Sequence, residues 1–151
     1  MNNFIQTILR QNDWDRKIFL LMKDEYIKQI KKSYAKYSFV LSSEMLEDLT
    51  LFYNMKLRYE LINKNGWTSN MILRFNVKKS SMFSQESLDW QAEKLNVDCV
   101  IHIADIDPGY ESIWLDEKGR VWGDYDQSVC FYGSTIFEGV ENIITNRGIK
   151  K

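Results

Sequence analysis

The chain has 151 residues, of which 44% are hydrophobic and 14% aromatic, and these values suit one domain built around one core. The formal net charge of -1 argues against a chain-wide basic surface of the kind that binds nucleic acid directly. The sequence contains no apolar run near the roughly 20 residues that a membrane-spanning helix needs, which excludes such a helix and predicts no membrane partner.

Charged residues are unevenly distributed along the chain. Residues 1–80 carry fourteen Lys and Arg against eight Asp and Glu, whereas residues 81–151 carry six against thirteen. This asymmetry predicts an acidic surface that faces a cationic partner. The alternative is an acidic face that contacts only solvent.

Apolar side chains predict that residues 1–66 form a helical N-terminal part, because they recur every three or four positions. The first stripe consists of Phe19, Met22, Tyr26, Ile30 and Tyr34, and Asp15 can cap its helix. A second helix would begin at Ser42 or Ser43 and stop at Gly66. Its stripe consists of Leu46, Leu49, Tyr53, Leu57 and Leu61.

Beyond Gly66 the apolar period changes from that of a helix to that of a strand. Residues 71–78 alternate in hydrophobicity and predict a half-buried strand. A short helix would follow, capped by Ser84 and ending near Leu95. Residues 99–104 are continuously apolar and predict a buried strand.

The last third of the chain predicts a β-hairpin, one more strand and a capped helix. Residues 116–119 are of types that favour turns, and they lie between two aromatic-rich runs. Gly119 can supply the positive φ that a short loop needs. A strand is expected near residues 129–132. Thr135 and Glu138 have the spacing of a capping box at the start of the C-terminal helix.

Together these elements predict an α+β fold, because hairpins give an antiparallel sheet and the helices are segregated from it. We expect a single domain over residues 1–151, with a mostly antiparallel sheet and the C-terminal helix within residues 67–148. The N-terminal helices and the C-terminal helix would pack on the sheet. Cys99 and Cys130 lie far apart in apolar runs, as expected of a reduced, cytoplasmic protein.

Few groups in the sequence suit catalysis or metal binding. His102, the single histidine, lies within a predicted strand, where we expect a structural or surface role. The pattern Asp105-x-Asp107-x-Gly109 is similar to the start of a calcium loop, but Tyr110 occupies the position of the loop glycine. The sequence has no Gly-x-Ser-x-Gly motif and no phosphate-binding glycine loop. We therefore expect no catalytic residue, no metal and no cofactor.

Two chemical alternatives stay open. The acids between Asp116 and Asp126 could supply a carboxylate pair for general acid–base catalysis, although spacing alone does not bring two of them together. Lysines interleaved with Tyr34 and Tyr37 could contact nucleic acid, although an exposed helix edge fits the near-neutral chain better. A partly exposed tryptophan would be a good interface anchor.

The stretch from about residue 95 to 147, roughly a third of the chain, resembles the SUKH superfamily of bacterial immunity proteins, and its third subgroup most closely. The resemblance rests on an acid-x-x-Gly-Arg hairpin followed by an aromatic residue, and on a glycine before a short C-terminal helix. The hairpin motif lies in residues 115–122 and the glycine and helix in residues 133–144, and residues 93–96 and the expected strand 100–103 also carry the resemblance.

The resemblance implies an α+β immunity protein that binds and neutralises a cognate polymorphic toxin, often a nuclease or deaminase. A toxin that acts on nucleic acid presents a cationic cleft, which an acidic surface can occupy. The alternative is a scaffold or regulatory interaction module. The acids in or beside predicted turns are the expected partner-binding residues. They are Asp105, Asp107, Glu111, Asp116, Glu117, Asp124 and Asp126.

Overall fold

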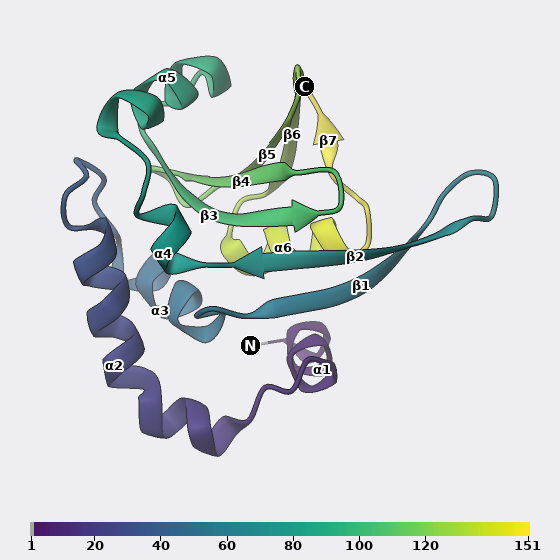
Figure 1. The fold of residues 1–151 in the computed structure, drawn as a ribbon, viewed down its shortest axis with the longest axis horizontal. Coiled ribbons are helices and arrows are strands. Elements are labelled where there is room, and N and C mark those ends of the chain that lie inside the picture. The colour runs from purple at the N-terminus through teal and green to yellow at the C-terminus, as the bar shows by residue number, and fades with distance from the viewer. Residues whose placement is uncertain (1) are drawn as a thin grey trace.

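A curled antiparallel sheet forms the centre of the protein (Figure 1). The computed structural model describes residues 2–151, and within them seven strands pair in chain order, each antiparallel to the next. The strands are β1 (Lys56–Ile62), β2 (Thr68–Phe75), β3 (Val100–Asp107), β4 (Glu111–Asp116), β5 (Val121–Tyr125), β6 (Ser128–Gly133) and β7 (Ile149–Lys150). This architecture confirms the predicted single α+β domain with an antiparallel sheet.

Helices cover both faces of this sheet. The helices are α1 (Asn3–Gln11), α2 (Arg16–Tyr34), α3 (Ser43–Leu51), α4 (Val77–Ser80), α5 (Gln85–Leu95) and α6 (Ile136–Ile144). On one face α6 packs against β1, β5 and β6 and contacts α1 and α3. On the other face α4 and α5 contact β3, while α2 packs against α3 and α4 (Figure 1).

Alternating side chains of the strands build the core beneath α6. Leu57, Leu73 and Leu115 point to this face and are fully buried. Phe52, just after α3, stacks on Phe75 of β2 with ring centroids 5.1 Å apart. Its edge also meets Phe137 of α6, with the ring centroids 5.9 Å apart. Aromatic contacts therefore join the N-terminal helices, the sheet and the C-terminal helix.

The prediction that residues 1–66 are helical is wrong after α3. That helix ends at Leu51, Asn54 adopts a positive φ of 51°, and β1 begins at Lys56. The apolar residues of 57–61 fit both periods, because Leu57 and Leu61 are also members of an alternating strand pattern. The sheet consequently begins eleven residues before the predicted boundary at residue 67.

Local helix signals predicted the starts of four helices. The side chains of Asp15, Ser42, Ser84 and Thr135 each accept a hydrogen bond from a backbone N–H in the first turn of the following helix. These caps confirm the predicted starts, because each satisfies a backbone donor that has no partner within the helix. The short elements α4 and β7 were not predicted, and the strand expected over residues 71–78 is wrong at its end, because α4 begins at Val77.

Gly119 has the predicted positive φ, at +81°, in the turn between β4 and β5. An added β-carbon would lie 3.6 Å from the Cε atom of Met45, which is an ordinary contact. Backbone strain alone should therefore lower the free energy of unfolding of Gly119→Ala by about 1–2 kcal/mol. Urea unfolding measures this loss, with Lys118→Ala in the same turn as the control. Equal stability of the two variants would contradict the turn assignment.

Candidate functional site

The seven acids expected to bind a partner do not share one exposed strip. Asp105 is 7% exposed and Asp116 is completely buried, so for these two the prediction of exposure is wrong. Asp107, Glu111, Glu117 and Asp124 are half-buried, and Asp126 alone among the seven is fully exposed. The other six acids are instead held by hydrogen bonds and ion pairs within the chain.

Asp116 anchors the β4–β5 hairpin from inside. Its Oδ1 atom accepts hydrogen bonds from the backbone N–H groups of Lys118 and Arg120, both at 2.9 Å. Its Oδ2 atom accepts from Nε of Arg120 at 2.6 Å and from the indole Nε1 of Trp122 at 2.9 Å. Four donors therefore satisfy this buried carboxylate, and it has no surface to offer a partner.

The remaining half-buried acids are also paired within the chain. Asp107 pairs with Arg74 at 3.3 Å, and Asp124 accepts hydrogen bonds from Lys94 of α5 at 2.9 and 3.1 Å. Three further contacts involve Glu111 and Glu117. The hydroxyl of Tyr132 donates to Glu111, Arg120 lies 3.8 Å from Glu117, and the backbone N–H of Cys99 donates to Glu117 at 3.4 Å.

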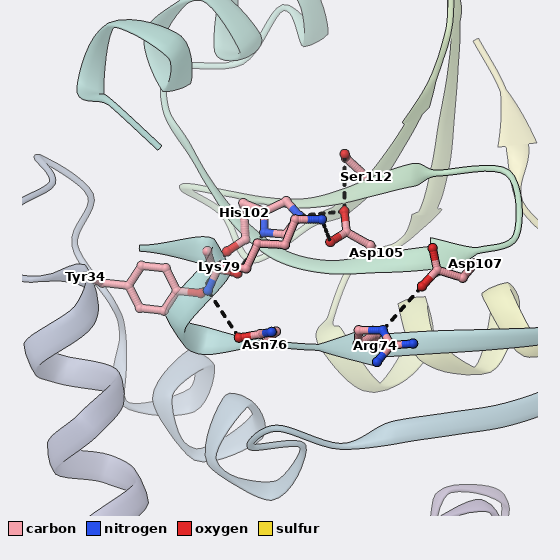
Figure 2. A network of polar contacts seen from close by, with 9 residues as sticks. Tyr34, Arg74, Asn76, Lys79, His102, Asp105, Asp107 and Ser112 are labelled. Carbon is pink, nitrogen blue, oxygen red and sulfur yellow. Dashed lines mark hydrogen bonds and ion pairs between the residues drawn. The ribbon is translucent and has the colours of Figure 1, made fainter. Parts of the chain in front are cut away.

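Asp105 belongs to a second polar network, which joins β3 to α2 and α4. Figure 2 shows His102, Lys79 and Ser112 gathered around its carboxylate. Nε2 of His102 lies 3.0 Å from Oδ1 of Asp105, and Nζ of Lys79 lies 2.6 Å from Oδ2. Burial by itself would raise the pKa of Asp105. The hydrogen bond and charge of His102, followed by those of Lys79, outweigh burial and lower this pKa to about 2.

Beyond Asp105, the network continues through His102 into the interior. Oγ of Ser80 lies 2.7 Å from Nδ1 of His102. The hydroxyl of Tyr34 on α2 donates to the backbone carbonyl of His102 at 2.7 Å. These bonds connect α2, α4 and β3 through polar groups that are almost entirely buried.

Ser80, His102 and Asp105 are the residue types of a hydrolase triad, but their arrangement does not suit that chemistry. Ser80 is 0% exposed and His102 is 1% exposed, so no substrate can reach the hydroxyl. In addition, the Asp105 carboxylate contacts Nε2 of His102, and the Ser80 hydroxyl contacts Nδ1 of the same ring. This is the reverse of the arrangement in serine proteases. The geometry therefore gives His102 a structural role, which is one of the two roles expected from the sequence.

Two further findings concern metal binding and membrane-spanning helices. Within residues 2–151, no group of three or more His, Cys, Asp or Glu side chains is placed to hold a metal ion. The two aspartates of the calcium-like pattern, Asp105 and Asp107, instead pair with Lys79 and Arg74. In the same residues, none of the helices combines the length and the apolar character required to cross a membrane.

The outward face of α5 carries several exposed acids. Leu88, Ala92 and Leu95 of this helix are buried, whereas the opposite face is exposed. Four of its exposed residues, Glu86, Asp89, Trp90 and Glu93, are here called the α5 acidic face, and Ser87 and Lys94 are exposed beside them. Among residues 2–151, none of its three carboxylates forms an ion pair, and Asp89 accepts only a hydrogen bond from Gln85.

Trp90 is 63% exposed in the middle of these acids, and it also forms one wall of a groove. The groove lies between α5 and β4 and has a volume of about 450 Å³. Its lining consists of Phe83, Ser84, Glu86, Ser87, Trp90, Gln91 and Trp114. An exposed tryptophan that lines an open groove and lies beside several acids is an arrangement that suits contact with another protein.

Sequence reasoning missed the α5 acidic face although the signal was present. The helix beginning at Ser84 was predicted, and its apolar residues point inward as expected. Helical geometry then places Glu86, Asp89, Trp90 and Glu93 on one face, since they are separated by three, four and seven positions. The predicted partner-binding residues were instead acids in or beside turns, most of which form hydrogen bonds or ion pairs within this fold.

Comparisons with known proteins returned no match: no family model fits the sequence, and neither a curated protein nor a solved structure is significantly similar.

Proposed function

We propose that this protein is an immunity protein that binds and neutralises a cognate toxin with a basic surface in the cytoplasm of the producing bacterial cell. The observation that carries this proposal is the α5 acidic face, with Trp90 exposed among three carboxylates that form no ion pair within residues 2–151. The resemblance of residues 95–147 to the SUKH superfamily supports the choice of a toxin as partner. The proposed role is binding, without a catalytic step.

The acids and the tryptophan of this face would contribute in different ways to the capture of a cationic protein. Glu86, Asp89 and Glu93 are exposed, so they attract a basic surface over a Debye length of roughly 8 Å at physiological salt. Attraction of this kind speeds association more than it slows dissociation. Trp90 offers a large apolar surface that loses its water on contact, and so contributes affinity.

A scaffold or regulatory module that has no toxin partner would use the same surface. The neighbouring gene therefore distinguishes an immunity protein from such a module. An immunity gene is expected beside a toxin gene, and the product of that neighbour should arrest growth of a bacterial host. Co-expression of this protein should then restore growth. A neighbour that is harmless, or a toxin against which this protein gives no protection, would contradict immunity.

Charge reversal on the α5 acidic face tests the binding surface directly. The triple variant Glu86→Lys, Asp89→Lys, Glu93→Lys should associate with the toxin at least about tenfold more slowly at low salt, because attraction becomes repulsion. Its rate should also lose the decrease with salt that the original protein shows. Stopped-flow measurements across salt concentrations give both quantities, and circular dichroism checks folding.

The matched control reverses three exposed acids elsewhere, in the variant Asp24→Lys, Glu47→Lys, Glu60→Lys. Both triple variants change the net charge equally, so a general charge effect would slow them equally. A specific site slows only the α5 variant. If the α5 variant associated as fast as the original protein, this face would not be the binding surface.

A further inference from the structure

We propose that the groove between α5 and β4 receives the guanidinium group of an arginine side chain from the partner protein. This inference deepens the proposed function and rests on it for the identity of the partner. Its physical basis is the lining of the groove, in which aromatic rings and hydrogen-bond acceptors are combined on one open surface.

The aromatic part of the lining suits a flat cation. Phe83 and Trp114 lie with ring centroids 5.5 Å apart, edge to face, and Trp90 lines the groove from α5. The faces of such rings are electron-rich and attract a cation that lies within about 6 Å. A guanidinium is planar and weakly hydrated, so it stacks on tryptophan at a smaller desolvation cost than a lysine ammonium.

Polar atoms of the groove add acceptors of the right charge. Glu86 is the single charged residue in the lining, and its carboxylate can accept two parallel hydrogen bonds from a guanidinium. The amide nitrogen of Gln91 donates to Asp124 at 2.9 Å, which leaves the amide oxygen of Gln91 as an acceptor. The lining contains the negative charge of Glu86 and no basic residue, so it favours a cation over an anion.

Lys94 already places one cation near the Trp90 ring within the chain. Its Nζ atom lies 5.6 Å from the ring centroid of Trp90. Both carboxylate oxygens of Asp124 accept hydrogen bonds from this ammonium, and the backbone carbonyl of Asp126 accepts another at 3.2 Å. Lys94 is thus held at the edge of the α5–β5 contact with its charge compensated, and Glu86 remains available for a second cation.

The test uses this protein and a small probe, N-acetyl-arginine amide, at constant ionic strength. Indole N–H signals in nitrogen-15 NMR spectra report each tryptophan separately. We expect saturable shifts at Trp90 and Trp114, and no saturable shift at the exposed Trp67 on the β1–β2 hairpin. The corresponding citrulline amide, which is neutral and nearly isosteric, should cause no such shift, and the lysine amide should bind at least fivefold more weakly.

Two variants and a control locate the site. Glu86→Gln should weaken arginine-amide binding at least fivefold and Trp90→Ala should abolish it, whereas Glu93→Gln, on the same helix face but outside the groove lining, should bind normally. Equal shifts from citrulline or lysine amide, or equal shifts at Trp67, would overturn the proposal. Because no toxin takes part, arginine binding without toxin binding would refute only the proposed function, and toxin binding without arginine binding would refute only the groove.

Discussion

Replacing Asp116 with asparagine is expected to lower the free energy of unfolding by about 3–5 kcal/mol, the cost of breaking a buried ion pair by removing one partner. The carboxylate is completely buried and accepts four hydrogen bonds, two from backbone N–H groups and two from Arg120 and Trp122. An asparagine amide presents N–H donors where these donors converge, so at least one bond becomes a repulsive contact. Urea unfolding followed by circular dichroism measures the loss.

The adjacent acid provides the control for this substitution. Glu117 is half-buried and lies 3.8 Å from the same Arg120 guanidinium, so Glu117→Gln should change the free energy of unfolding by no more than about 1 kcal/mol. Both substitutions remove one negative charge from neighbouring positions of one turn. If their effects were equal and small, Asp116 would not be the internal anchor of the hairpin.

The hairpin illustrates which part of this structure was predictable from sequence. Its turn was predictable because residues 116–119 have local turn chemistry and Gly119 adopts the expected positive φ. The burial of Asp116 was not predictable. It depends on the return of β5, whose Trp122 pairs with Trp114 across the sheet and directs an indole N–H to the carboxylate. An acid beside a turn is therefore mistaken for a surface group.

The segment after α3 shows a different limit. Tyr53, Leu57 and Leu61 satisfy helical spacing, yet Leu57, Tyr59 and Leu61 satisfy strand spacing equally well. Tertiary structure decides between them, because β1 pairs with β2 over seven residues and buries Leu57 beneath α6. By contrast, helix caps such as Asp15 and Thr135 act within one turn and were predicted correctly.

In the candidate site, too, one part could be predicted from the sequence and another could not. The α5 acidic face follows from the periodicity of one helix, so its residues could be derived from the sequence. The groove could not, because it requires Phe83 before the helix and Trp114 from β4 to meet Trp90 in space. Likewise, the sequence indicates that His102 lies in a strand, but its contacts with Ser80 and Asp105 arise from packing and from a register shift in β3 between His102 and Ala104.

Replacing Asp105 with asparagine is expected to lower the free energy of unfolding by about 2–3 kcal/mol at pH 7. The pKa of Asp105 falls from 3.8 to about 2 in the folded protein, and each pKa unit corresponds to about 1.4 kcal/mol. A carboxyl group whose folded pKa is depressed stabilises the protein above its unfolded pKa. That stabilisation is lost as the pH falls from about 4 to about 2, because the unfolded chain then binds the proton more readily.

The two proteins should therefore converge in stability on acidification. Urea unfolding at pH 7, 4 and 3 should show a difference that is full at pH 7 and clearly smaller at pH 3. Asp107→Asn is the control, since this half-buried neighbour pairs with Arg74 at 3.3 Å and should cost less than about 1 kcal/mol. A loss for Asp105→Asn that stayed constant with pH would show that the side chain acts through its shape alone. A loss that diminishes in acid would show that its charge, held by His102 and Lys79, joins α4 to the sheet.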